Sequence, residues 1–492
     1  MKRLPLAAAL CATMLTGCGS TVQLSARPVS AGSSGGDLSI VTAPPAPDPG
    51  SGHGAAAAPP ATQPLGQPQS SHPSHRSSQP ISSPTISRTA ASTAATANSS
   101  GSGPVRVGLL YVSGATALAQ SLGISGLSTG DPVAQAKAIT AYINGHGGLA
   151  GRRIQLYEGA VNASSAASNV ESAYGAACAK LVQDDKVSYV VSYTNLSASR
   201  LACYAKAGVT LLDDQSGVPD PAGAADANLF ASPGELALGR ASRELVDDLW
   251  RRGWLNARSK VGTFSWDTPD GHLFISKYLD PALASHGLKP VAAAFVTNDA
   301  SAANQGGTVL KFRSSGVDRV IPIAASPLFF MEAAQTQGYY PAYAVTSTWG
   351  PGALIESTAP KNQLRNAAGI GWDKYLDIGA GKMPGAVSSN ETLCFHIMKS
   401  AGQASNTTTV QTFETALCNV MLFLQAVSKK FGLGPQMLQL ARDANFTFPS
   451  ADAFVIRLAP GRADGVSAYR DIAYETSCNC FQYTSGNRAT SS

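Results

Sequence analysis

Short apolar runs alternate with segments of helical periodicity along most of the chain after residue 104. Val105–Val112 is almost entirely apolar, as expected of a strand that is covered on both faces of its sheet. Asp131-Pro132 then places a good helix N-cap before a good first helical residue. Apolar residues follow at intervals of three to four positions, up to the glycines near residue 147. This pattern predicts a buried strand followed by an amphipathic helix.

The same alternation recurs, and glycines follow most of the predicted helices. Further strands are expected at Arg153–Tyr157, Val187–Ser192, Val209–Asp213, Lys260–Trp266, Pro290–Val296, Arg319–Ala324 and Ala342–Thr346. Helices are expected before Gly208 and at residues 165–184, 235–253, 271–286, 302–315 and 327–337. Repeated strand–helix units of this kind predict an α/β fold with parallel sheets flanked by helices.

The pattern changes in the last third of the chain. Helices are expected at residues 389–402, 408–430, 435–444 and 449–458, followed by a hairpin at residues 468–484. The longest late apolar stretch, Val420–Val427, is helical in period and shorter than the about 20 residues that span a bilayer. We therefore expect no membrane-spanning helix.

The first residues have the pattern of an export signal. Lys2 and Arg3 precede an apolar run at residues 4–14, and Leu15-Thr16-Gly17-Cys18 follows. These four residues resemble the lipobox of bacterial lipoproteins, which implies cleavage after residue 17 and lipidation of Cys18. Attached acyl chains would hold the protein at the extracytoplasmic face of the cell membrane. The alternative is an ordinary secretory signal peptide in which the cysteine occurs by chance.

Residues 19–103 are rich in Ser, Ala, Pro, Gly and Thr and contain very few large apolar side chains. Such a segment buries too little apolar surface to offset the loss of chain entropy on folding. We interpret residues 18–103 as a lipid-anchored flexible linker with an end-to-end distance of roughly 50 Å. A low-complexity insert without a spacing role is the alternative.

Charge and motif content exclude several classes of function. The net charge is +5, and no cluster of Lys and Arg forms the basic patch that nucleic-acid binding requires. The sequence contains no HExxH or GxxxxGK[ST] motif, so we expect no enzyme and no cofactor.

Cysteines are the next constraint, because an exported protein is exposed to an oxidising compartment. Cys11 lies within the signal, which leaves an even set of cysteines in the folded part, at positions 178, 203, 394, 418, 478 and 480. Sequence proximity favours Cys178–Cys203 and Cys394–Cys418. Cys478 and Cys480 then pair across one residue or exchange with another pair. A structural zinc site is the competing interpretation, and the absence of paired CxxC motifs disfavours it.

Several stretches, in this order and spacing, resemble the type I periplasmic binding proteins, and more closely the branched-chain amino acid (Leu/Ile/Val) binding proteins of ABC transporters. These are VRVGLLYVSG at 105–114, YINGHGGLAGRRIQLY at 142–157, YVVSYT at 189–194, VGTFSWDTPDG at 261–271, GVDRVIPIA at 316–324 and GYYPAYAVTSTW at 338–349. The resemblance covers nearly all of residues 104–485.

The resemblance implies two α/β lobes joined by three crossings, with a small-molecule ligand enclosed between them. We expect a ligand-binding domain at 104–485, in which lobe one is 104–232 and 346–450, lobe two is 233–345 and 451–485, and 486–492 is a tail. It also implies that Cys178 and Cys203, on helices before and after one strand, lie close enough to pair. We expect a monomer without metal that delivers its solute to an ABC permease.

Candidate site residues come from the rule that ligands bind at the carboxyl ends of parallel strands. The loops at these ends offer hydroxyls and helix N-termini for an anion, and carboxylates, indoles and phenols for a cation or an apolar group. We select Ser113, Ser192, Tyr193, Thr194, Asp214, Ser216, Trp266, Asp270, Ser326, Thr348 and Trp349.

The resemblance implies that Ser192, Tyr193, Thr194 and Ser216 receive a ligand carboxylate. An acidic residue usually meets the ammonium at the crossing back to lobe one, but Thr346–Trp349 contains none. Asp213, Asp214 or Asp270 is then expected to meet a cation, and Trp266 and Trp349 to form a flat wall. The expected function is capture of an amino-acid-like solute for import. The alternative is a sensor or partner protein of the same fold that acts on a cell-wall synthase or signalling protein.

Overall fold

The structure is a computed structural model. It describes residues 103–114, 116–117, 130–194, 197–214, 227–296, 305–323, 327–356, 359–378, 388–405 and 408–491. The predicted signal peptide, Cys18 and the predicted linker lie outside the described residues, as do Ser216 and Ser326.

The first lobe contains a parallel sheet in the order β2-β1-β3-β4-β5. Its strands are β1 (Val105–Ser113), β2 (Ile154–Asn162), β3 (Tyr189–Tyr193), β4 (Thr210–Asp213) and β5 (Phe230–Ala231). Alternate side chains of β1 enter different cores, because Leu109 packs with the Ile139 side of the sheet and Leu110 with the Tyr174 side. The strand is therefore covered on both faces, as its apolar composition predicts.

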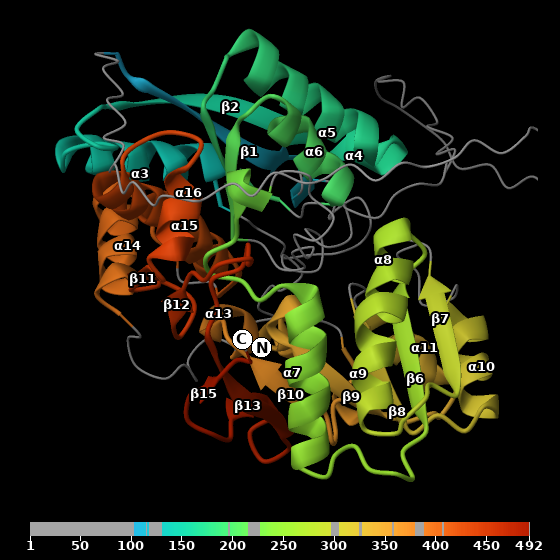
Figure 1. The fold of residues 1–492 in the computed structure, drawn as a ribbon. Helices are drawn as coiled ribbons and strands as arrows, with labels where there is room; N and C mark the ends of the chain where they lie inside the picture. The colour runs from blue at the N-terminus through green and yellow to red at the C-terminus, as the bar shows by residue number, and fades with distance from the viewer. Residues whose placement is uncertain are drawn as a thin grey trace, which may run out of the picture. The chain divides into compact units, whose positions relative to one another are not determined.

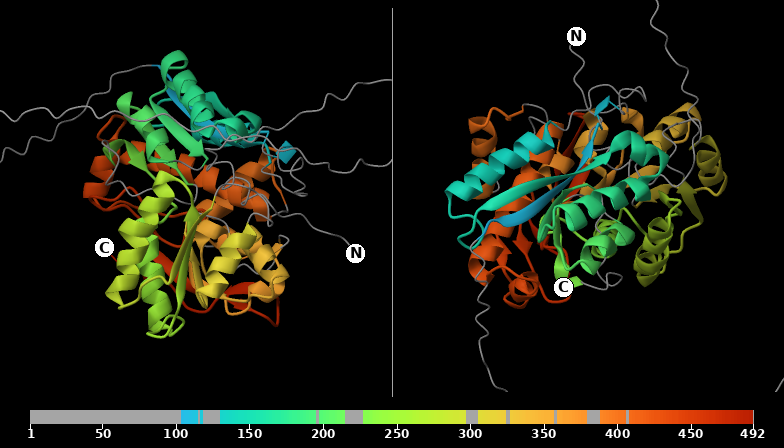
Figure 2. Two further views of the ribbon diagram at one scale, coloured as in Figure 1. Left: turned by 90° about the vertical axis from the view of Figure 1, so that its right-hand side faces the viewer. Right: turned by 90° about the horizontal axis from the view of Figure 1, so that it is seen from above.

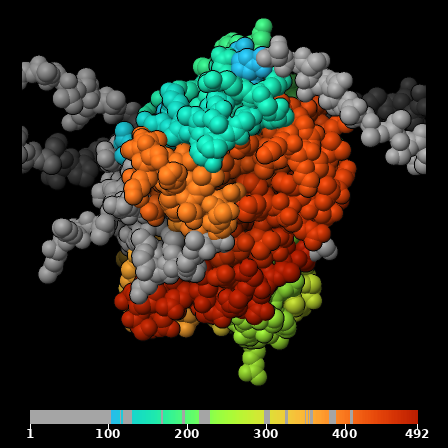
Figure 3. Space-filling model, turned by 90° about the vertical axis from the view of Figure 1, so that its left-hand side faces the viewer, coloured from blue at the N-terminus to red at the C-terminus, as the bar shows by residue number. Residues whose placement is uncertain are grey.

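Helices from two distant parts of the chain cover this sheet. One face carries α4 (Ala163–Ser168), α5 (Val170–Ala179) and α6 (Ala198–Lys206). The other carries α3 (Pro132–Gly145), together with the late helices α14 (Ser389–Ser400), α15 (Thr408–Phe431) and α16 (Met437–Asp443). Figure 3 shows these late helices, in orange, lying directly against the early segments, in cyan.

The second lobe contains a mixed sheet in the order β14-β13-β10-β9-β8-β6-β7, with β15 paired to β13. Its parallel strands are β6 (Val261–Trp266), β7 (Ala292–Val296), β8 (Arg319–Pro322), β9 (Ala342–Thr346) and β10 (Ala368–Gly371). The antiparallel strands are β13 (Ala468–Glu475), β14 (Cys480–Tyr483) and β15 (Arg488–Ala489).

Helices also flank this second sheet on both faces (Figures 1 and 2). One face carries α7 (Leu238–Arg251) and the run α8 (Pro269–Leu273), η4 (Phe274–Leu279) and α9 (Asp280–Ser285). The other carries α10 (Gly306–Ser314), α11 (Leu328–Thr336) and α12 (Pro351–Glu356). The predicted α/β class with helix-covered parallel sheets is confirmed.

The structure corrects three of the sequence predictions. We assigned residues 346–450 to lobe one, but β10 pairs with β9 in the second sheet, and the chain rejoins the first lobe only at α14. The helix predicted at 449–458 is absent there; the short strands β11 (Thr447–Phe448) and β12 (Ile456–Arg457) pair instead. The helix predicted at 165–184 is divided at Asn169, whose extended backbone and side-chain bond to the Ser172 amide start α5 afresh.

Three disulfides staple the described chain. Cys178–Cys203 joins α5 to α6, and Cys394–Cys418 joins α14 to α15, as sequence proximity predicted. Cys478–Cys480 closes across one residue in the turn of the predicted hairpin. The first of the two alternatives for Cys478 and Cys480 is therefore confirmed.

One described helix is long and apolar enough by composition to cross a membrane. This is the segment Val410–Phe431 of α15, and 83% of its most apolar window is buried inside the fold. Its side chains, including Phe413, Leu417 and Phe423, belong to the main core. Packing therefore explains its apolar character.

Candidate functional site

The carboxyl ends of the two parallel sheets are joined by a contact between β3 and β6 loops. Asp270 lies in the first turn of α8, directly after β6, and its carboxyl is close enough to the backbone N–H of Ala198 for that N–H to lower its pKa. Ala198 is the first residue of α6, which follows β3 in the other lobe. The loops that the sequence selected in the two lobes therefore face each other.

The surroundings of Asp270 explain why this contact is stable. Burial raises the pKa of its carboxyl, while the Ala198 N–H and the Arg200 guanidinium act in the opposite direction. Arg200 is itself held by Glu171, through Nε at 3.1 Å and Nη2 at 2.8 Å, and lies 4.0 Å from the ring centre of Tyr174. A carboxylate at a helix N-terminus beside a guanidinium is favourable. Asp270 thus bridges the lobes, where we had expected it to bind a cationic group of the ligand.

Ser192 and Thr194 form the lobe-one wall of this region at the end of β3. Both are buried, and the Ser192 Oγ accepts the Thr194 backbone N–H at 3.2 Å. The two hydroxyl oxygens are also 3.2 Å apart. The pair is therefore a local turn whose hydroxyls are held together. Tyr193 lies between them in β3, with its side chain outside the described atoms, and Ser113 ends β1 half-buried.

The lobe-two side carries an aromatic group. Trp266, at the end of β6, is half-buried and packs against the second lobe's core. Six positions later, His272 stacks on Phe295 with ring centres 3.6 Å apart, and its Nε2 lies 2.8 Å from Asp267 Oδ1. No local pattern pointed to His272 or Phe295, because their contact joins α8 to β7. Trp266 and Phe295 lie on opposite faces of the second sheet, because Trp266 packs with the α10–α12 core and Phe295 with the α7–α9 core.

A glycine brings α8 against the end of β6. A Cβ added at Gly271 would lie 2.2 Å from the Trp266 carbonyl oxygen, which is far inside contact distance. The Thr268 hydroxyl accepts the Gly271 N–H at 3.1 Å and caps the helix. Gly271 therefore fixes where the first turn of α8, and with it Asp270, faces the other lobe.

A small cavity lies between α7 and the ends of β8 and β9. Its walls are mostly apolar, with three hydroxyl-bearing residues, and they are formed by Leu238, Ala241, Ser242, Leu245, Pro322, Ile323, Thr346 and Thr348. The predicted residue Thr348 is buried, and its hydroxyl has no hydrogen-bond partner within the described residues. Trp349 follows in the same 3-10 turn (Ser347–Trp349), with its side chain outside the described atoms. The contribution of α7 was missed, because its apolar face is indistinguishable in sequence from a packing face.

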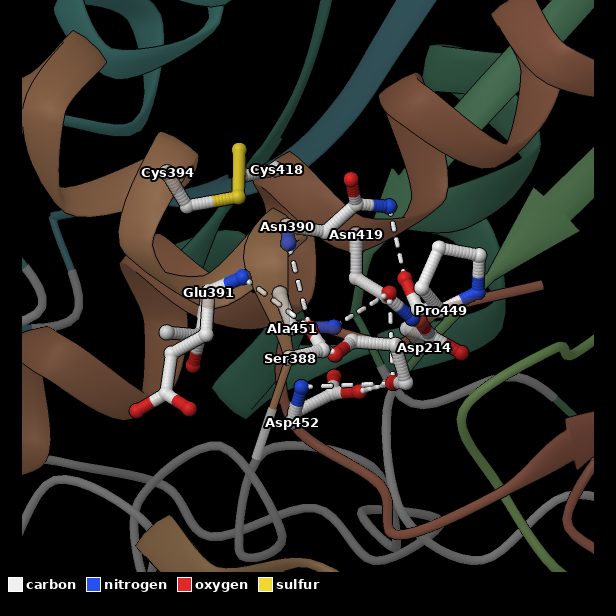
Figure 4. The surroundings of a disulfide bond; sticks show 12 residues. Asp214, Ser388, Asn390, Glu391, Cys394, Cys418, Asn419, Pro449, Ala451 and Asp452 are labelled. Carbon is white, nitrogen blue, oxygen red and sulfur yellow. Dashed lines mark hydrogen bonds between the residues drawn. A yellow bond between two sulfur atoms is a disulfide. The ribbon is translucent and has the colours of Figure 1, made fainter. Parts of the chain in front are cut away.

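Asp214 occupies a different place from the one predicted for a ligand residue. It is buried, and its two carboxylate oxygens accept the Gly234 N–H and the Asn419 side-chain N–H. Asn419 Oδ1 in turn accepts the Ala451 N–H at 2.9 Å. Figure 4 shows this set beside the Cys394–Cys418 disulfide. Asp214 therefore ties α15 to the segments by which the chain leaves the first lobe, near residues 234 and 451.

Further buried carboxyls continue from Asp214 along these connecting segments. We call Asp214, Glu235, Asp373, Asp377 and Asp452 the interlobe cluster. Glu235 accepts the Trp372 Nε1–H at 3.2 Å, and the Ser347 Oγ accepts the Trp372 N–H at 2.7 Å. Asp373 forms a β-bridge with Ala453. The cluster thus joins the strand ends of the second lobe to both connecting segments.

Burial dominates the electrostatics of the interlobe cluster. It raises the pKa of Asp373 to about 7 and that of Asp452 to about 6, and the charge of Asp452 adds to the effect on Asp373. Burial also raises the pKa of Asp214 and Glu235 well above their usual range. Near neutral pH the Asp373 carboxyl is therefore partly protonated and can donate as well as accept hydrogen bonds.

Solved structures of similar fold are found among solute-binding proteins. A type 1 periplasmic binding protein from Bordetella pertussis Tohama I matches with a TM-score of 0.57 at 12% identity, over 77% of this chain and 99% of that chain. The chain has the type I periplasmic-binding-protein fold. The fold that the sequence resemblance implied is therefore confirmed.

Two further structures with this type I fold were solved with ligands. A solute-binding protein of an ABC transporter from Rhodopseudomonas palustris BisB5, in complex with 3,4-dihydroxybenzoic acid, has a TM-score of 0.56 at 14% identity. The match covers 79% of this chain and 98% of that one. A branched-chain amino acid transporter substrate-binding protein from Streptococcus pneumoniae, in complex with isoleucine, has a TM-score of 0.54 at 12% identity and covers 79% and 99%. No family model and no curated protein matches the sequence.

Proposed function

We propose that this chain is an extracytoplasmic solute-binding lipoprotein. It captures a small polar or amphipathic solute, such as an amino acid or an aromatic acid, when the two lobes close, and it presents the closed form to an ABC importer. The observation that carries this proposal is the proximity of Asp270 and Ala198, which brings the carboxyl ends of two parallel sheets together. This edge of a parallel sheet is where ligands bind in open α/β folds.

The ligand class follows from the side chains on either wall. The hydroxyls of Ser192 and Thr194 suit a carboxylate, and the Trp266 ring suits an apolar or aromatic body. The structural relatives with isoleucine and with 3,4-dihydroxybenzoic acid support a ligand that combines these two parts. Tyr193, Ser216, Ser326 and Trp349 remain proposed ligand residues on the strength of the sequence.

A ligand screen tests this proposal directly. Amino acids, aromatic acids, amides, polyamines and nucleobases are added one at a time to the full-length protein, and the melting temperature is measured. A true ligand should raise it in proportion to RT ln(1 + [L]/Kd). The Trp266→Ala variant should lose most of this rise, because it removes the largest described side chain of the aromatic wall. A screen in which no compound stabilises the protein would contradict solute capture.

Replacing Asp270 with alanine should weaken ligand binding about tenfold, although the residue contacts the other lobe. The variant loses the favourable interaction between the Asp270 carboxylate and the Ala198 N–H, which we expect lobe closure to form. Isothermal titration calorimetry with a ligand from the screen measures the change. Asp270→Asn keeps an acceptor for the Ala198 N–H and should have an intermediate affinity. Equal affinities for all three proteins would show that the contact has no part in closure.

Lipid attachment at Cys18 is a second part of the proposal, and it is supported by the Leu15–Cys18 pattern. Cys18→Ser should move the protein from the membrane fraction to the soluble fraction, because the thioether cannot form. Fractionation followed by immunoblotting measures this. Cys11→Ser, which changes a cysteine within the predicted signal, is the matched control and should leave the protein in the membrane fraction. Membrane retention of the Cys18→Ser protein would contradict lipidation.

The length of residues 19–103 favours one alternative function. A partner protein that reaches a cell-wall synthase or a sensor needs a longer tether than docking on a membrane permease does. Two results together would favour this alternative: no solute stabilises the protein, and shortening the tether causes a cell-wall defect.

A further inference from the structure

The turn between β13 and β14 carries a disulfide that closes on itself across one residue. Asn479, between Cys478 and Cys480, has a left-handed backbone with φ of 49°. The Tyr474 hydroxyl donates to Asn479 Oδ1 at 3.0 Å, and strand pairing continues up to Glu475 and Cys480. Strand pairing and this hydrogen bond therefore already specify the turn.

This disulfide contributes the least of the three to folding. Cross-linking stabilises a protein mainly by restricting the unfolded chain, and the effect grows with the length of the closed loop. The partners are separated by 25 and 24 positions in the other two disulfides but by 2 positions here. The bond is thus poorly explained as a structural staple.

The surroundings of the two sulfurs favour exchange with an external thiol. Cys478 is half-buried among the exposed residues Ser477 and Asn479, whereas Cys480 is 7% exposed. The Gln482 side-chain amide donates to both sulfurs, with Nε2 3.4 Å from Cys478 Sγ and 3.5 Å from Cys480 Sγ. A nearby donor stabilises the thiolate that leaves when the bond is attacked.

We propose that Cys478–Cys480 is a thiol–disulfide exchange site for an external thiol. The incoming thiolate attacks Cys478 Sγ and forms a mixed disulfide, and the electron pair of the broken S–S bond leaves with Cys480 as its thiolate. A second donor thiol then attacks the donor sulfur in this mixed disulfide, and Cys478 leaves as its thiolate. The donor thiols are oxidised to a disulfide, and the protein gains two electrons and the two protons that the donor thiols lose.

The first experiment compares the three disulfides in the full-length protein under native conditions. The protein is incubated with increasing dithiothreitol, free thiols are blocked with N-ethylmaleimide, and alkylation is measured by peptide mass spectrometry, with Cys11 and Cys18 scored apart. Cys478 and Cys480 should become alkylated at a thiol concentration at least tenfold below that needed for Cys178–Cys203 or Cys394–Cys418. Reduction of all three together, or of Cys478–Cys480 last, would overturn the proposal.

Variants test the direction of attack and the source of the thiol. After incubation with oxidised glutathione, Cys480→Ser should carry a glutathione adduct on Cys478, and Cys478→Ser should form several-fold less adduct on the buried Cys480. Equal adducts on both would overturn the assigned direction. Reduction of the native protein by glutathione alone would identify a small thiol as a sufficient donor, and reduction only by dithiols would indicate a protein dithiol.

Gln482 is a positioning residue in this proposal. Gln482→Leu should slow reduction about threefold to tenfold and shift its pH profile upward, because the leaving thiolate loses a donor. The melting temperature should not change, since Gln482 is exposed. Gln482→Asn or Gln482→His, which retain a donor, should recover part of the rate. A pH profile identical in Gln482→Leu and the native protein would remove Gln482 from the site.

Discussion

Gly369→Ala should prevent the protein from folding, with an expected cost above about 4 kcal/mol. Gly369 lies in β10 opposite Val345 of β9, and an added Cβ would lie 1.7 Å from the Val345 carbonyl oxygen. The obstruction is backbone rather than a movable side chain, and β9 is held on its other edge by β8. The clash between the added Cβ and the Val345 carbonyl can therefore be relieved only by breaking the β9–β10 pairing in the middle of the second sheet.

The measurement is the yield of folded protein and its thermal or urea unfolding by circular dichroism. Gly307→Ala is the matched control, because Gly307 lies in α10 and an added Cβ there has no neighbour within 4 Å. That variant should be as stable as the native protein or up to about 1 kcal/mol more stable. A Gly369→Ala protein with native stability would show that β10 does not pair with β9 in this register.

β10 also shows why part of the second lobe was misassigned from sequence. Ala368-Gly369-Ile370-Gly371 has low strand propensity, because glycine is disfavoured in strands. Both glycines of β10 are required for lack of space. An added Cβ at Gly369 would meet the Val345 backbone, and one at Gly371 would lie 2.1 Å from the Asp377 carboxylate. The contact with Val345 is long-range, so local patterns do not contain it.

The elements with strong local signals were predicted well. Gly287, Gly316 and Gly338 were expected to end helices, and each has a positive φ, of 73°, 68° and 61°. Only glycine adopts this conformation without strain, which makes it a reliable stop signal. The apolar runs at β1, β6 and β9 likewise became buried strands, because a strand that is covered on both faces needs no alternation.

The candidate site was predicted less completely than the fold. The sequence located the strand ends correctly, but it did not separate residues that face a ligand from residues that join the lobes. Asp214 has its partners at Gly234 and at Asn419, which is 205 positions away. Asp270 has its partner at Ala198 in the other lobe. Both carboxylates look like ligand residues until these distant partners are known.

The second large effect is expected at Asp373: Asp373→Asn should stabilise the protein by about 1–3 kcal/mol at pH 8, and by progressively less as the pH falls toward 4. Burial raises the pKa of this carboxyl from 3.8 to about 7, so the folded state retains a proton that the unfolded state releases. Its contribution to stability is therefore full below about pH 4 and is lost as the pH rises through about 7. Asparagine stays neutral throughout and keeps an oxygen to cap the Tyr375 and Leu376 amides of α13 (Lys374–Asp377).

For the native protein the same reasoning predicts a fall in unfolding free energy between pH 5 and pH 8, at about 1.4 kcal/mol per pH unit for each extra proton bound by the folded state. The pKa of Asp452 and Asp248 is raised to about 6 and that of Glu414 to about 7, mainly by burial, so the variant should retain part of this slope. The lowered pKa of Asp471, about 2, has the opposite sign but acts only below about pH 4.

Urea unfolding at several pH values distinguishes the role of Asp373 from a general charge effect. Asp443→Asn, an exposed change on α16, removes the same charge and should leave the native slope intact. Asp373→Asn should flatten the slope, because it removes a group whose ionisation is opposed by burial in the interlobe cluster. Identical slopes for Asp373→Asn and the native protein would mean that Asp373 is ionised without penalty. Since Asp373 links the second lobe to Ala453, a flattened slope would also identify these connecting segments as the part of the fold that responds to pH.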